Sequence, residues 1–474
     1  MQQETSSAST SENAHNQSLI ADVLKLFSMK SHLIQSPVSR RRFIQSAAAF
    51  TAFGAIPIIG AESGRKYRVA LIGSGWWGMN ILREAMASGS CHVVAMCDPS
   101  QQTLDVAANQ VTEASGDQPK KYQDFRELLD QAKPEIVIIA TPDHWHALIT
   151  IASLRAGAHV FVEKPTGHTV EESRAMVETT KATGKVVQVG LHRRIGPHHV
   201  SGLKFLRSGG AGDIGMVRMF VNSRGGKERP SPNSEPPEGM NWDLYCGPAP
   251  LRPYNGKIHP GGWRNFLAFA NGTLGDWGVH WLDQVLRWTD EKHPKRIYST
   301  GGRPIQGKPV LNATEQTTDA PDSQVAVYEF ESFTATWEHR KFAGTGAEKT
   351  GVGCYFFGTK GTFHMGWRDG WTFYPADEKN NPTHQESELQ EPDGHNLTLL
   401  WKDFITSIQD GKKPVADVES AHRSTSLSLL GMLSLKLGRS IRWDGEKETI
   451  LDDPEANRLL RRPYRAPWVY PTVD

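Results

Sequence analysis

The chain has 474 residues, a formal net charge of +1 and 38% hydrophobic residues, which is enough for two domains of ordinary size. With no basic run beyond residues 40–42, this balanced charge gives no reason to expect a nucleic acid as partner. The four cysteines show no C-x-x-C spacing, so neither a zinc site of that kind nor a disulfide framework is indicated.

Residues 1–62 are expected to precede the folded part of the chain. Residues 39–45 read Ser-Arg-Arg-Arg-Phe-Ile-Gln and lead into a short Ala-rich apolar stretch, a pattern typical of twin-arginine export signals. The stretch is too short for a stable membrane anchor. We therefore expect residues 29–62 to direct export to the periplasm through the twin-arginine machinery, and residues 1–28 to be an over-called start or a disordered leader. The alternative is a basic patch beside a chance apolar helix.

A nucleotide-binding pattern follows. Residues 69–72 are a short apolar run, as expected of a strand buried on both faces of a parallel sheet. In the G-x-G-x-x-G sequence after it, Gly73 permits the tight turn, Gly75 lets main chain approach phosphates, and Gly78 lets the next helix pack closely. The amino end of that helix offers free N–H groups and a positive dipole to a pyrophosphate. The alternative is a glycine-rich turn of purely structural use.

An acidic residue stands where a cofactor ribose would lie. Asp98 ends the second apolar run, twenty residues after Gly78, the spacing at which a carboxylate accepts hydrogen bonds from ribose hydroxyls. The same carboxylate would repel a 2′-phosphate, so the sequence predicts NAD in preference to NADP. Because free NAD is scarce outside the cytoplasm, an exported protein is expected to hold its NAD tightly.

Strand and helix patterns alternate through the rest of this half. Apolar runs at 135–141, 159–162 and 186–189 are separated by helical segments, the last of them at 170–183. This rhythm predicts an α/β fold with a doubly wound parallel sheet of the Rossmann type, in which ligands bind at the carboxyl ends of the strands. We assign residues 66–192 to this NAD-binding domain.

The second half of the sequence shows a different pattern of predicted elements. Its strand-like runs predict an α+β domain with a large, mostly antiparallel sheet, covered on one face by helices. The predicted strands are 216–223, 296–300, 324–330, 333–338, 352–357, 361–365 and 371–374, and the predicted helices are 281–288, 397–409 and 418–437. We assign residues 193–445 to substrate binding and oligomerisation, and residues 446–474 to an extended C-terminal arm.

Three side chains offer the acid–base chemistry that oxidation of a carbinol needs. Lys164 follows a predicted strand end and can donate to a substrate oxygen that gains negative charge. His280 titrates nearest neutrality and is the natural general base. Asp276 precedes it by four residues, so a helix would place both on one face, where the carboxylate can orient the imidazole or substrate hydroxyls. The alternatives are a solvated edge lysine, a structural cap with a core histidine, or two metal ligands without a fixed third partner.

Several of these motifs occur together in a known family. From Lys66 onward the chain resembles the family of glucose–fructose oxidoreductase, inositol dehydrogenase and related sugar dehydrogenases (Gfo/Idh/MocA), and it looks most like the exported branch of that family. The matching motifs are residues 73–78, Thr141-Pro142 with His146, Glu163-Lys164-Pro165, Gly190 followed by His192-Arg193-Arg194, and residues 275–280. The resemblance implies that Lys164, Asp276 and His280 are the catalytic trio.

The resemblance also implies which other side chains meet the ligands. Besides the three glycines and Asp98, the expected cofactor contacts are Trp76, Trp77, Thr141, Pro142, His146, Glu163 and Lys164. The expected substrate contacts are Lys164, His192, Arg193, Trp263, Arg264, Asp276 and His280. For Arg193 the alternative is a simple pairing with an acid at a domain hinge. The aromatic-rich loop that carries Trp263 suits a carbohydrate, although its rings can equally serve to anchor the loop. Such sheets in this family often mediate dimers, which implies a homo-oligomer, a dimer or a tetramer.

Three functions are compatible with these residues. The first is an NAD-dependent oxidoreductase acting on a hydroxyl of a sugar, cyclitol or related carbohydrate. The second is a glycoside-cleaving enzyme in which transient oxidation permits elimination, with the same cofactor and trio. The third is a non-catalytic sugar-binding protein, which the presence of both Lys164 and His280 disfavours. No metal is expected.

Overall fold

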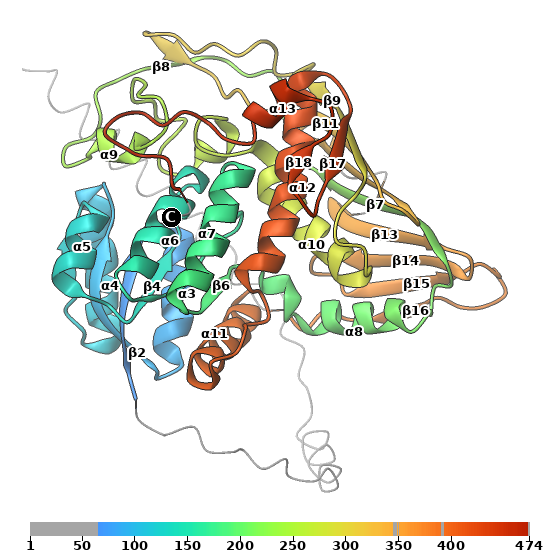
Figure 1. Ribbon diagram of the computed structural model, residues 1–474, viewed down its shortest axis with the longest axis horizontal. Coiled ribbons are helices and arrows are strands. Elements are labelled where there is room, and N and C mark those ends of the chain that lie inside the picture. The colour runs from blue at the N-terminus through green and yellow to red at the C-terminus, as the bar shows by residue number, and fades with distance from the viewer. Residues whose placement is uncertain (1–64, 345–347, 349, 390–392, 473–474) are drawn as a thin grey trace, which may run out of the picture. The chain divides into compact units, whose positions relative to one another are not determined.

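The computed structural model describes residues 65–344, 348, 350–389 and 393–472, which belong to one unit of mutual contacts. The expected leader and export signal, residues 1–62, lie outside the described residues. Two large sheets make up the framework of the described part, one of six strands and one of ten (Figure 1).

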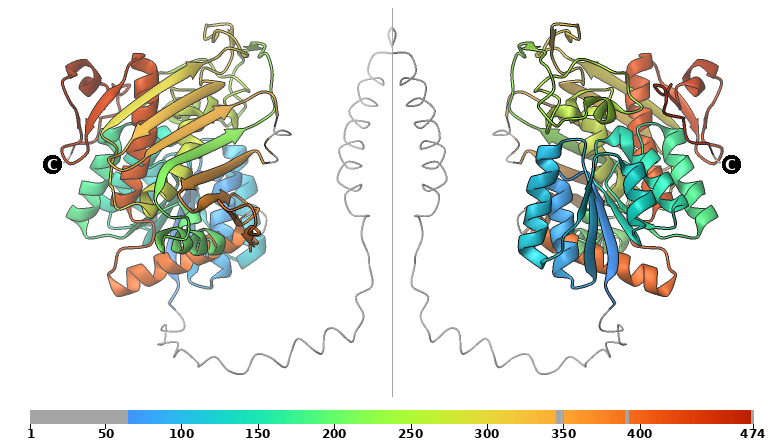
Figure 2. Two further views of the ribbon diagram at one scale, coloured as in Figure 1. Left: turned by 90° about the vertical axis from the view of Figure 1, so that its right-hand side faces the viewer. Right: turned by 90° about the vertical axis from the view of Figure 1, so that its left-hand side faces the viewer.

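The six-stranded sheet is parallel throughout, with the order β3-β2-β1-β4-β5-β6. Its strands are β1 (Tyr67–Ile72), β2 (Cys91–Cys97), β3 (Lys120–Tyr122), β4 (Ile136–Ile139), β5 (His159–Val162) and β6 (Val187–Val189). The helices that alternate with them are α3 (Trp76–Ala87), α4 (Gln101–Ser115), α5 (Phe125–Ala132), α6 (Asp143–Arg155) and α7 (Val170–Thr183), and they lie on either side of the strands (Figure 2, right). The predicted doubly wound parallel sheet is confirmed.

Burial and helix capping explain why these segments take these forms. All of β4 is buried and β1 exposes only Arg68, which is possible when helices cover both faces of a sheet. Ser100 and Asp124 each accept a backbone N–H at the start of α4 and α5. Thr169 and Glu172 form a reciprocal capping box that begins α7. Because β1 lies between β2 and β4, the strand order reverses there and a crevice forms at the carboxyl ends.

The ten-stranded sheet has the order β16-β15-β14-β13-β7-β12-β11-β9-β17-β18. Its strands are β7 (Ile214–Asn222), β9 (Arg296–Gly302), β11 (Ser323–Glu329), β12 (Thr334–Arg340), β13 (Val352–Gly358), β14 (Gly361–Gly366), β15 (Trp371–Pro375), β16 (Thr383–Gln385), β17 (Ile441–Asp444) and β18 (Thr449–Ile450). Among these described strands, β7 and β12 run parallel and the other pairs run antiparallel. The prediction of a large, mostly antiparallel sheet is confirmed.

Helices cover one face of this sheet. Helices α8 (Pro197–Arg207), α10 (Val279–Trp288) and α12 (Val418–Leu437) lie behind it when its other face is turned toward the viewer (Figure 2, left). The indole of Trp281 on α10 and that of Trp337 on β12 are both fully buried in the core between them. Helix α11 (Gly394–Asp410) instead packs against α3 and completes the core of the parallel sheet.

The loop between β7 and α10 is held by its own aromatic residues. It contains β8 (Ser231–Pro232), which pairs with β10 (Glu315–Gln316), and the short helix α9 (Trp242–Cys246). The rings of Trp242 and Tyr245 stack 4.8 Å apart, and both are buried together with Phe266. Of the two roles expected for these aromatic residues, anchoring of the loop is the one that these three rings fulfil.

The C-terminal residues differ from the expected extended arm. Residues 446–460 include β18 and helix α13 (Pro454–Arg458), whose first turn is capped by Asp453. Only the part beyond them runs without a helix or strand. Trp468 in that part packs edge-on against Trp145, with ring centroids 4.7 Å apart, so the chain end lies on the parallel-sheet domain.

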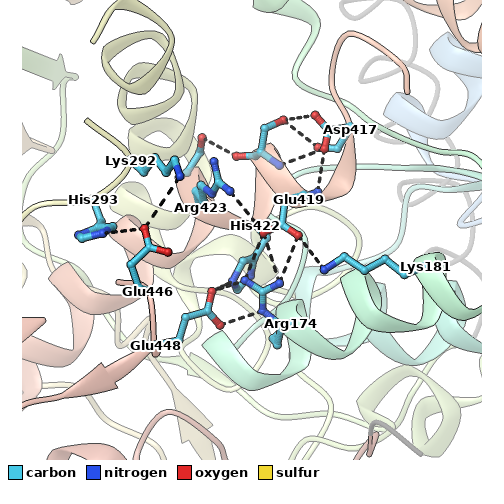
Figure 3. Close-up of polar contacts among 12 residues, drawn as sticks. Arg174, Lys181, Lys292, His293, Asp417, Glu419, His422, Arg423, Glu446 and Glu448 are labelled. Carbon is cyan, nitrogen blue, oxygen red and sulfur yellow. Dashed lines mark hydrogen bonds and ion pairs between the residues drawn. The ribbon is translucent and has the colours of Figure 1, made fainter. Parts of the chain in front are cut away.

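A network of ion pairs ties α7 to α12, and we call it the Arg174 cluster (Figure 3). The Arg174 guanidinium binds Glu448, which follows β17, and also Glu419 on α12. His422 on α12 contacts Glu448 as well, at 2.6 Å. Lys181 on α7 lies 3.2 Å from Glu419. The cluster therefore fastens the parallel-sheet domain to the helix that covers the second sheet.

Candidate functional site

A cavity of about 290 Å³, here called the crossover cavity, opens at the carboxyl ends of β1, β2 and β4. Gly73 and Gly75 line it from the first turn, Asp98 from the end of β2, and Thr141 with Pro142 from the end of β4. It therefore lies at the reversal of strand order, which is where doubly wound sheets bind their ligands.

The three glycines of the first turn are required for different reasons. Gly73 has a φ of +92°, and a Cβ there would lie 2.7 Å from the main chain of Ala140. A Cβ on Gly78 would lie 2.2 Å from the Gly73 carbonyl oxygen, so only glycine lets α3 pack this closely. Gly75 faces open space, which leaves its main chain free to approach a phosphate.

Asp98 is held rigidly at the wall of the crossover cavity. Its carboxylate accepts hydrogen bonds from the Ser74 N–H at 2.9 Å and the Ser100 N–H at 3.0 Å. Burial raises the pKa of Asp98 to about 6, against the effect of these two hydrogen bonds. A carboxylate has about four acceptor positions, so those that remain can bind ribose hydroxyls.

A second cavity of about 300 Å³, the lysine cavity, adjoins the first through Trp76, Trp77 and Thr141. The Lys164 ammonium donates to the Asp276 carboxylate at 2.6 Å and to the Asp276 carbonyl at 2.8 Å. Burial opposes ionisation of Asp276, but Lys164 and Arg264 outweigh it and lower the pKa of Asp276. The predicted lysine–aspartate pair is thus brought together in the structure.

His280 and His192 complete the floor of the lysine cavity. Their rings meet edge-on with centroids 5.5 Å apart, and both side chains are buried. Burial, followed by the charge of Lys164, lowers the pKa of His280 well below its usual value. The interpretation of His280 as a group titrating near neutrality is therefore wrong: its imidazole is neutral. The residue lines the lysine cavity, and its buried Nδ1 has no hydrogen-bond partner among the described residues.

Asp276 and His280 do not share the regular helix face that their spacing suggested. Residues 274–278 form a π-helical turn, and α10 begins only at Val279. A π turn adds a residue to each loop of hydrogen bonds and is frequent at functional sites. Here it turns the Asp276 carboxylate to Lys164 and Arg264, and no hydrogen bond joins it to His280.

Two more carboxyl groups line the lysine cavity. Burial raises the pKa of Glu163 to about 7, against the effect of Lys164. Burial likewise raises the pKa of Asp143, at the start of α6, to about 7. Each has one carboxyl oxygen without a hydrogen-bond partner in the described chain. Such perturbed and unsatisfied groups in a cavity are typical of a functional site.

The expected cofactor contact His146 is engaged with the main chain. Its Nδ1 lies 2.7 Å from the Pro165 carbonyl oxygen, and its Nε2 lies 2.9 Å from that of Thr141. The ring therefore braces the turn after β4 against the loop after Lys164. It lines the lysine cavity, but both of its nitrogens face main-chain carbonyl oxygens.

Of the two roles expected for Arg193, the structure shows pairing with an acid, and the side chain does not line the cavity. Its guanidinium is fully buried, lies 3.5 Å from the ring centre of Trp367 and pairs with Asp393 at 3.2 Å. Trp367, not Arg193, faces the cavity. Arg193 therefore supports the wall from behind, because its neighbour His192 takes the side that faces inward.

The other expected ligand contacts lie around the cavity mouths. Trp76 is 69% exposed, whereas Trp77 is half-buried. Trp263 and Arg264 line both the crossover and the lysine cavity. The Arg264 guanidinium lies 4.2 Å from the Trp263 ring centre and 3.5 Å from the Asp276 carboxylate.

Among the lining residues that were not foreseen from the sequence are Trp277, Trp367, Arg368 and Asp393. Trp367 and Arg368 follow β14, and Asp393 precedes α11. The only signal for them was a Trp-Arg pair between two predicted strands, and nothing in that pair pointed to the lysine cavity. Within the described residues no group of three potential metal ligands exists. Nor does that part of the chain contain a helix long and apolar enough to cross a membrane.

Two family descriptions match the chain. Residues 67–191 match an oxidoreductase family with an NAD-binding Rossmann fold, and residues 220–470 match the C-terminal alpha/beta domain of the same Gfo/Idh/MocA family. Together these ranges contain the lining residues of the lysine cavity except His192.

Curated relatives match a smaller part. A glycosyl hydrolase family 109 protein of Stenotrophomonas maltophilia is 36% identical over 154 residues, which are 31% of this chain and 34% of that protein. One from Saccharopolyspora erythraea is 31% identical over 173 residues, 31% of this chain and 38% of that protein. The chain thus spans about a third of the length of these relatives.

Solved structures share the fold over most of the chain. The aldose-aldose oxidoreductase from Caulobacter crescentus, complexed with glycerol, has a TM-score of 0.59 at 19% identity, covering 80% of this chain and 100% of that one. Levoglucosan dehydrogenase in complex with NADH and levoglucosan has a TM-score of 0.60 at 19% identity, covering 80% and 99%. At such identities the likeness shows the fold alone.

Proposed function

Because this chain belongs to the Gfo/Idh/MocA oxidoreductase family, we propose that it oxidises a hydroxyl group of a sugar, cyclitol or related carbohydrate with NAD. The observation that carries the proposal is the lysine cavity, in which a partly buried ammonium–carboxylate pair and two buried histidines adjoin the crossover cavity. The levoglucosan dehydrogenase with the same fold is complexed with NADH and a sugar derivative.

The crossover cavity suits NAD. Gly75 leaves room for a pyrophosphate beside the amino end of α3, and Asp98 is placed for the adenosine ribose. A 2′-phosphate would meet the Asp98 carboxylate, which favours NAD over NADP. Bound with its nicotinamide toward the lysine cavity, NAD would accept hydride from a carbinol carbon.

The side chains of the lysine cavity have different roles in the proposed reaction. Lys164 donates a hydrogen bond to the substrate oxygen and stabilises negative charge that develops there. His280, neutral because of its burial, can accept the hydroxyl proton at a ring nitrogen. Asp276 holds the Lys164 ammonium in place at 2.6 Å. Trp277 and Trp367 offer aromatic faces to the C–H side of a sugar ring.

A second candidate function uses the same residues. The curated relatives are glycosyl hydrolase family 109 proteins, which favours a cleavage in which oxidation of a ring carbon is transient and a glycosidic bond is broken by elimination. Glu163 and Asp143, with pKa values of about 7, can move protons in such a sequence. The two candidates differ in product: an oxidised sugar with NADH, or a cleaved glycoside with no net NADH.

One screen tests both candidates. The protein is incubated with a panel of monosaccharides, cyclitols and glycosides, while nicotinamide absorbance and products are followed together. We expect at least one carbohydrate to reduce NAD or to be cleaved, and the Lys164→Met variant to do neither. If no carbohydrate reacts with the NAD-loaded protein, or if Lys164→Met is as active as the wild type, the proposal fails.

We further propose export with the cofactor already in place. The twin-arginine pattern in residues 39–45 supports export of a folded protein. His259, Pro260 and Trp263 line the crossover cavity in addition to the strand ends, and these added walls support retention of NAD. Protein isolated from the periplasm should contain about one NAD per chain after removal of free nucleotide, measured by mass spectrometry. Retention in the cytoplasm, or protein recovered without nucleotide, would argue against this proposal.

We also propose a homo-oligomer formed through the open face of the ten-stranded sheet. Large apolar side chains are exposed on five of its strands: Met216, Tyr298, Val325, Phe357 and Tyr374. Met216 and Phe357 are register partners, and exposed apolar side chains on one sheet face are typical of an interface. Analytical ultracentrifugation should give a dimer or tetramer, and Val325→Lys with Tyr298→Lys should shift it to monomer; a monomeric wild type would refute the proposal.

A further inference from the structure

A third cavity adjoins the other two, and nothing in the chemistry above uses it. This sheet-end cavity, of about 380 Å³, lies between the loop after β7, the ends of β12 and β13, and the π-helical turn. It shares Arg264, Asp276 and Trp277 with the lysine cavity, so the two cavities meet at those three side chains. A molecule that reacts at Lys164 and is larger than one ring can extend into it.

Lys341 places a positive charge in the sheet-end cavity. It follows the last residue of β12, and its main-chain N–H donates to the Asp322 carbonyl at 2.8 Å, which fixes its position. Its ammonium donates a short hydrogen bond to the Asn265 side-chain oxygen. Among the described residues no carboxylate lies within ion-pairing distance of this ammonium.

Other half-buried or buried cations near this site are paired with acids. Lys164 pairs with Asp276 at 2.6 Å, and Lys257 and Arg303 pair with Glu228 at 2.7 and 2.9 Å. An ammonium withdrawn from water is costly unless an anion or several acceptors compensate it. Burial lowers the pKa of Lys341, with Asp276 opposing that effect. The carboxylates of Asp276, Asp322 and Glu228 favour the charged ammonium from beyond ion-pairing distance. Its direct partner is a neutral amide oxygen, and an anionic ligand in the cavity would compensate the charge more strongly.

We propose that the sheet-end cavity is a second saccharide subsite in which Lys341 and Arg264 bind an anionic substituent, a carboxylate or a sulfate ester, of the unit next to the reacting ring. The inference rests on the proposed carbohydrate chemistry of the lysine cavity. Asn265 positions the Lys341 ammonium, and Trp277 lies at the boundary between the two units. Lys341 is thus a specificity-determining residue and takes no part in the bond-making steps.

Matched substrates test this proposal. The NAD-loaded protein is offered disaccharides that differ only in the second unit, which is neutral, carries a carboxylate or carries a sulfate ester. We expect kcat/KM for an acidic disaccharide to exceed that of its neutral partner by about 10- to 100-fold, the worth of one charged hydrogen bond. Comparing the carboxylate-bearing with the sulfate-bearing disaccharide shows which of the two anionic groups the subsite prefers. A wild type that does not distinguish acidic from neutral partners would refute the subsite.

Three variants separate specificity from folding. Lys341→Met should abolish the preference for acidic disaccharides and leave kcat/KM for a neutral monosaccharide unchanged, whereas Lys341→Arg should keep most of the preference. Lys436→Met, at an exposed lysine of α12, should match the wild type. An equal loss with neutral and acidic substrates in Lys341→Met would contradict the proposal.

A binding measurement tests the subsite independently of turnover. Calorimetric titration with the same disaccharides should give a dissociation constant about 10-fold or more lower for the acidic one, and the difference should vanish in Lys341→Met. If no saccharide reacts but this difference is present, the proposed function fails and the subsite stands. If saccharides react but bind without such a difference, the subsite fails and the proposed function stands.

Discussion

The lysine cavity and the Arg174 cluster are both built from ion pairs that join the same two domains, yet they differ in how completely their polar atoms are satisfied. In the cluster, the Arg174 guanidinium binds carboxylates of Glu448 and Glu419 (Figure 3). In the cavity, Lys164 and Asp276 are paired, but His280 and Glu163 around them each keep a buried polar atom without a partner among the described residues.

An ion pair between domains therefore does not mark a functional site by itself. A saturated pair has nothing left to offer a ligand and serves mainly to hold elements together. Buried polar atoms without partners cost free energy, and in a cavity they are groups that a ligand can satisfy. The comparison predicts that variants of the cavity lose activity, whereas variants of the cluster lose stability.

The largest effect should come from Lys164→Met. Without the ammonium, the substrate oxygen loses its hydrogen-bond donor, and we expect kcat to fall by about 10²- to 10⁴-fold. Bound NAD should be retained, because the substitution leaves Asp98 and the glycine turn unchanged. Steady-state kinetics on the carbohydrate identified in the screen, with nucleotide content measured in parallel, check both parts. A variant that turns over normally would show that the cavity does not perform the chemistry.

Asp98→Asn should have the next largest effect, on the cofactor. Replacing the carboxylate removes charged hydrogen bonds to the ribose, so the dissociation constant for NAD should rise by about 10- to 100-fold, while binding of NADP should weaken less. Titration of protein stripped of nucleotide measures both constants. Asp105→Asn, at an exposed carboxylate on α4, is the matched control and should leave them unchanged. An unaltered affinity for NAD in Asp98→Asn would remove Asp98 from the cofactor site.

Arg174→Met should show the opposite behaviour to Lys164→Met. Its partly buried pairs with Glu448 and Glu419 are lost, which should lower the free energy of unfolding by about 1–3 kcal/mol. Its kcat should stay at the wild-type value. Lys181→Met, at the exposed edge of the same cluster, should cost less than about 1 kcal/mol. Denaturant unfolding monitors stability, and a large loss of kcat in stable Arg174→Met protein would contradict the comparison.

The smallest effect should be a pair of opposite pH dependences. Burial raises the pKa of Glu163 from 4.5 to about 7, so the stability linked to it is present below pH 4.5 and is lost as pH rises toward 7. The pKa of Glu448 falls from 4.5 to about 2, because its hydrogen bonds from Arg174 and His422 outweigh burial. The stability linked to Glu448 is therefore present above pH 4.5 and is lost as pH falls toward 2.

Unfolding of nucleotide-free Glu163→Gln, Glu448→Gln and wild-type protein across this pH range measures the two dependences. The free energy of unfolding of the wild type relative to Glu163→Gln should fall with rising pH. The free energy of unfolding of the wild type relative to Glu448→Gln should fall with falling pH. Two differences that change in the same direction would show that the environments of the two carboxyl groups are alike.

Much of the framework could be predicted because its causes are local in sequence. The apolar run before Gly73 and the steric demands on Gly73 and Gly78 are properties of one short segment. Helix α12 was expected at 418–437 and is found at Val418–Leu437, since its capping Asp417 and terminal Gly438 flank it directly. By contrast, α4 was not predicted, because its apolar face is short and its charged residues are few.

The site could be predicted only in part. From the sequence, Lys164 was predicted to follow a strand of a parallel sheet, and the resemblance of the motifs to the family placed Lys164 and Asp276 in one site. Three features came from the tertiary structure: Arg193 lies behind Trp367, a π-helical turn separates Asp276 from the His280 face, and Lys341 lines the same cavity as Arg264. Distances and pKa values depend on burial among residues far apart in the chain, and burial is a property of the packed fold that no local pattern contains.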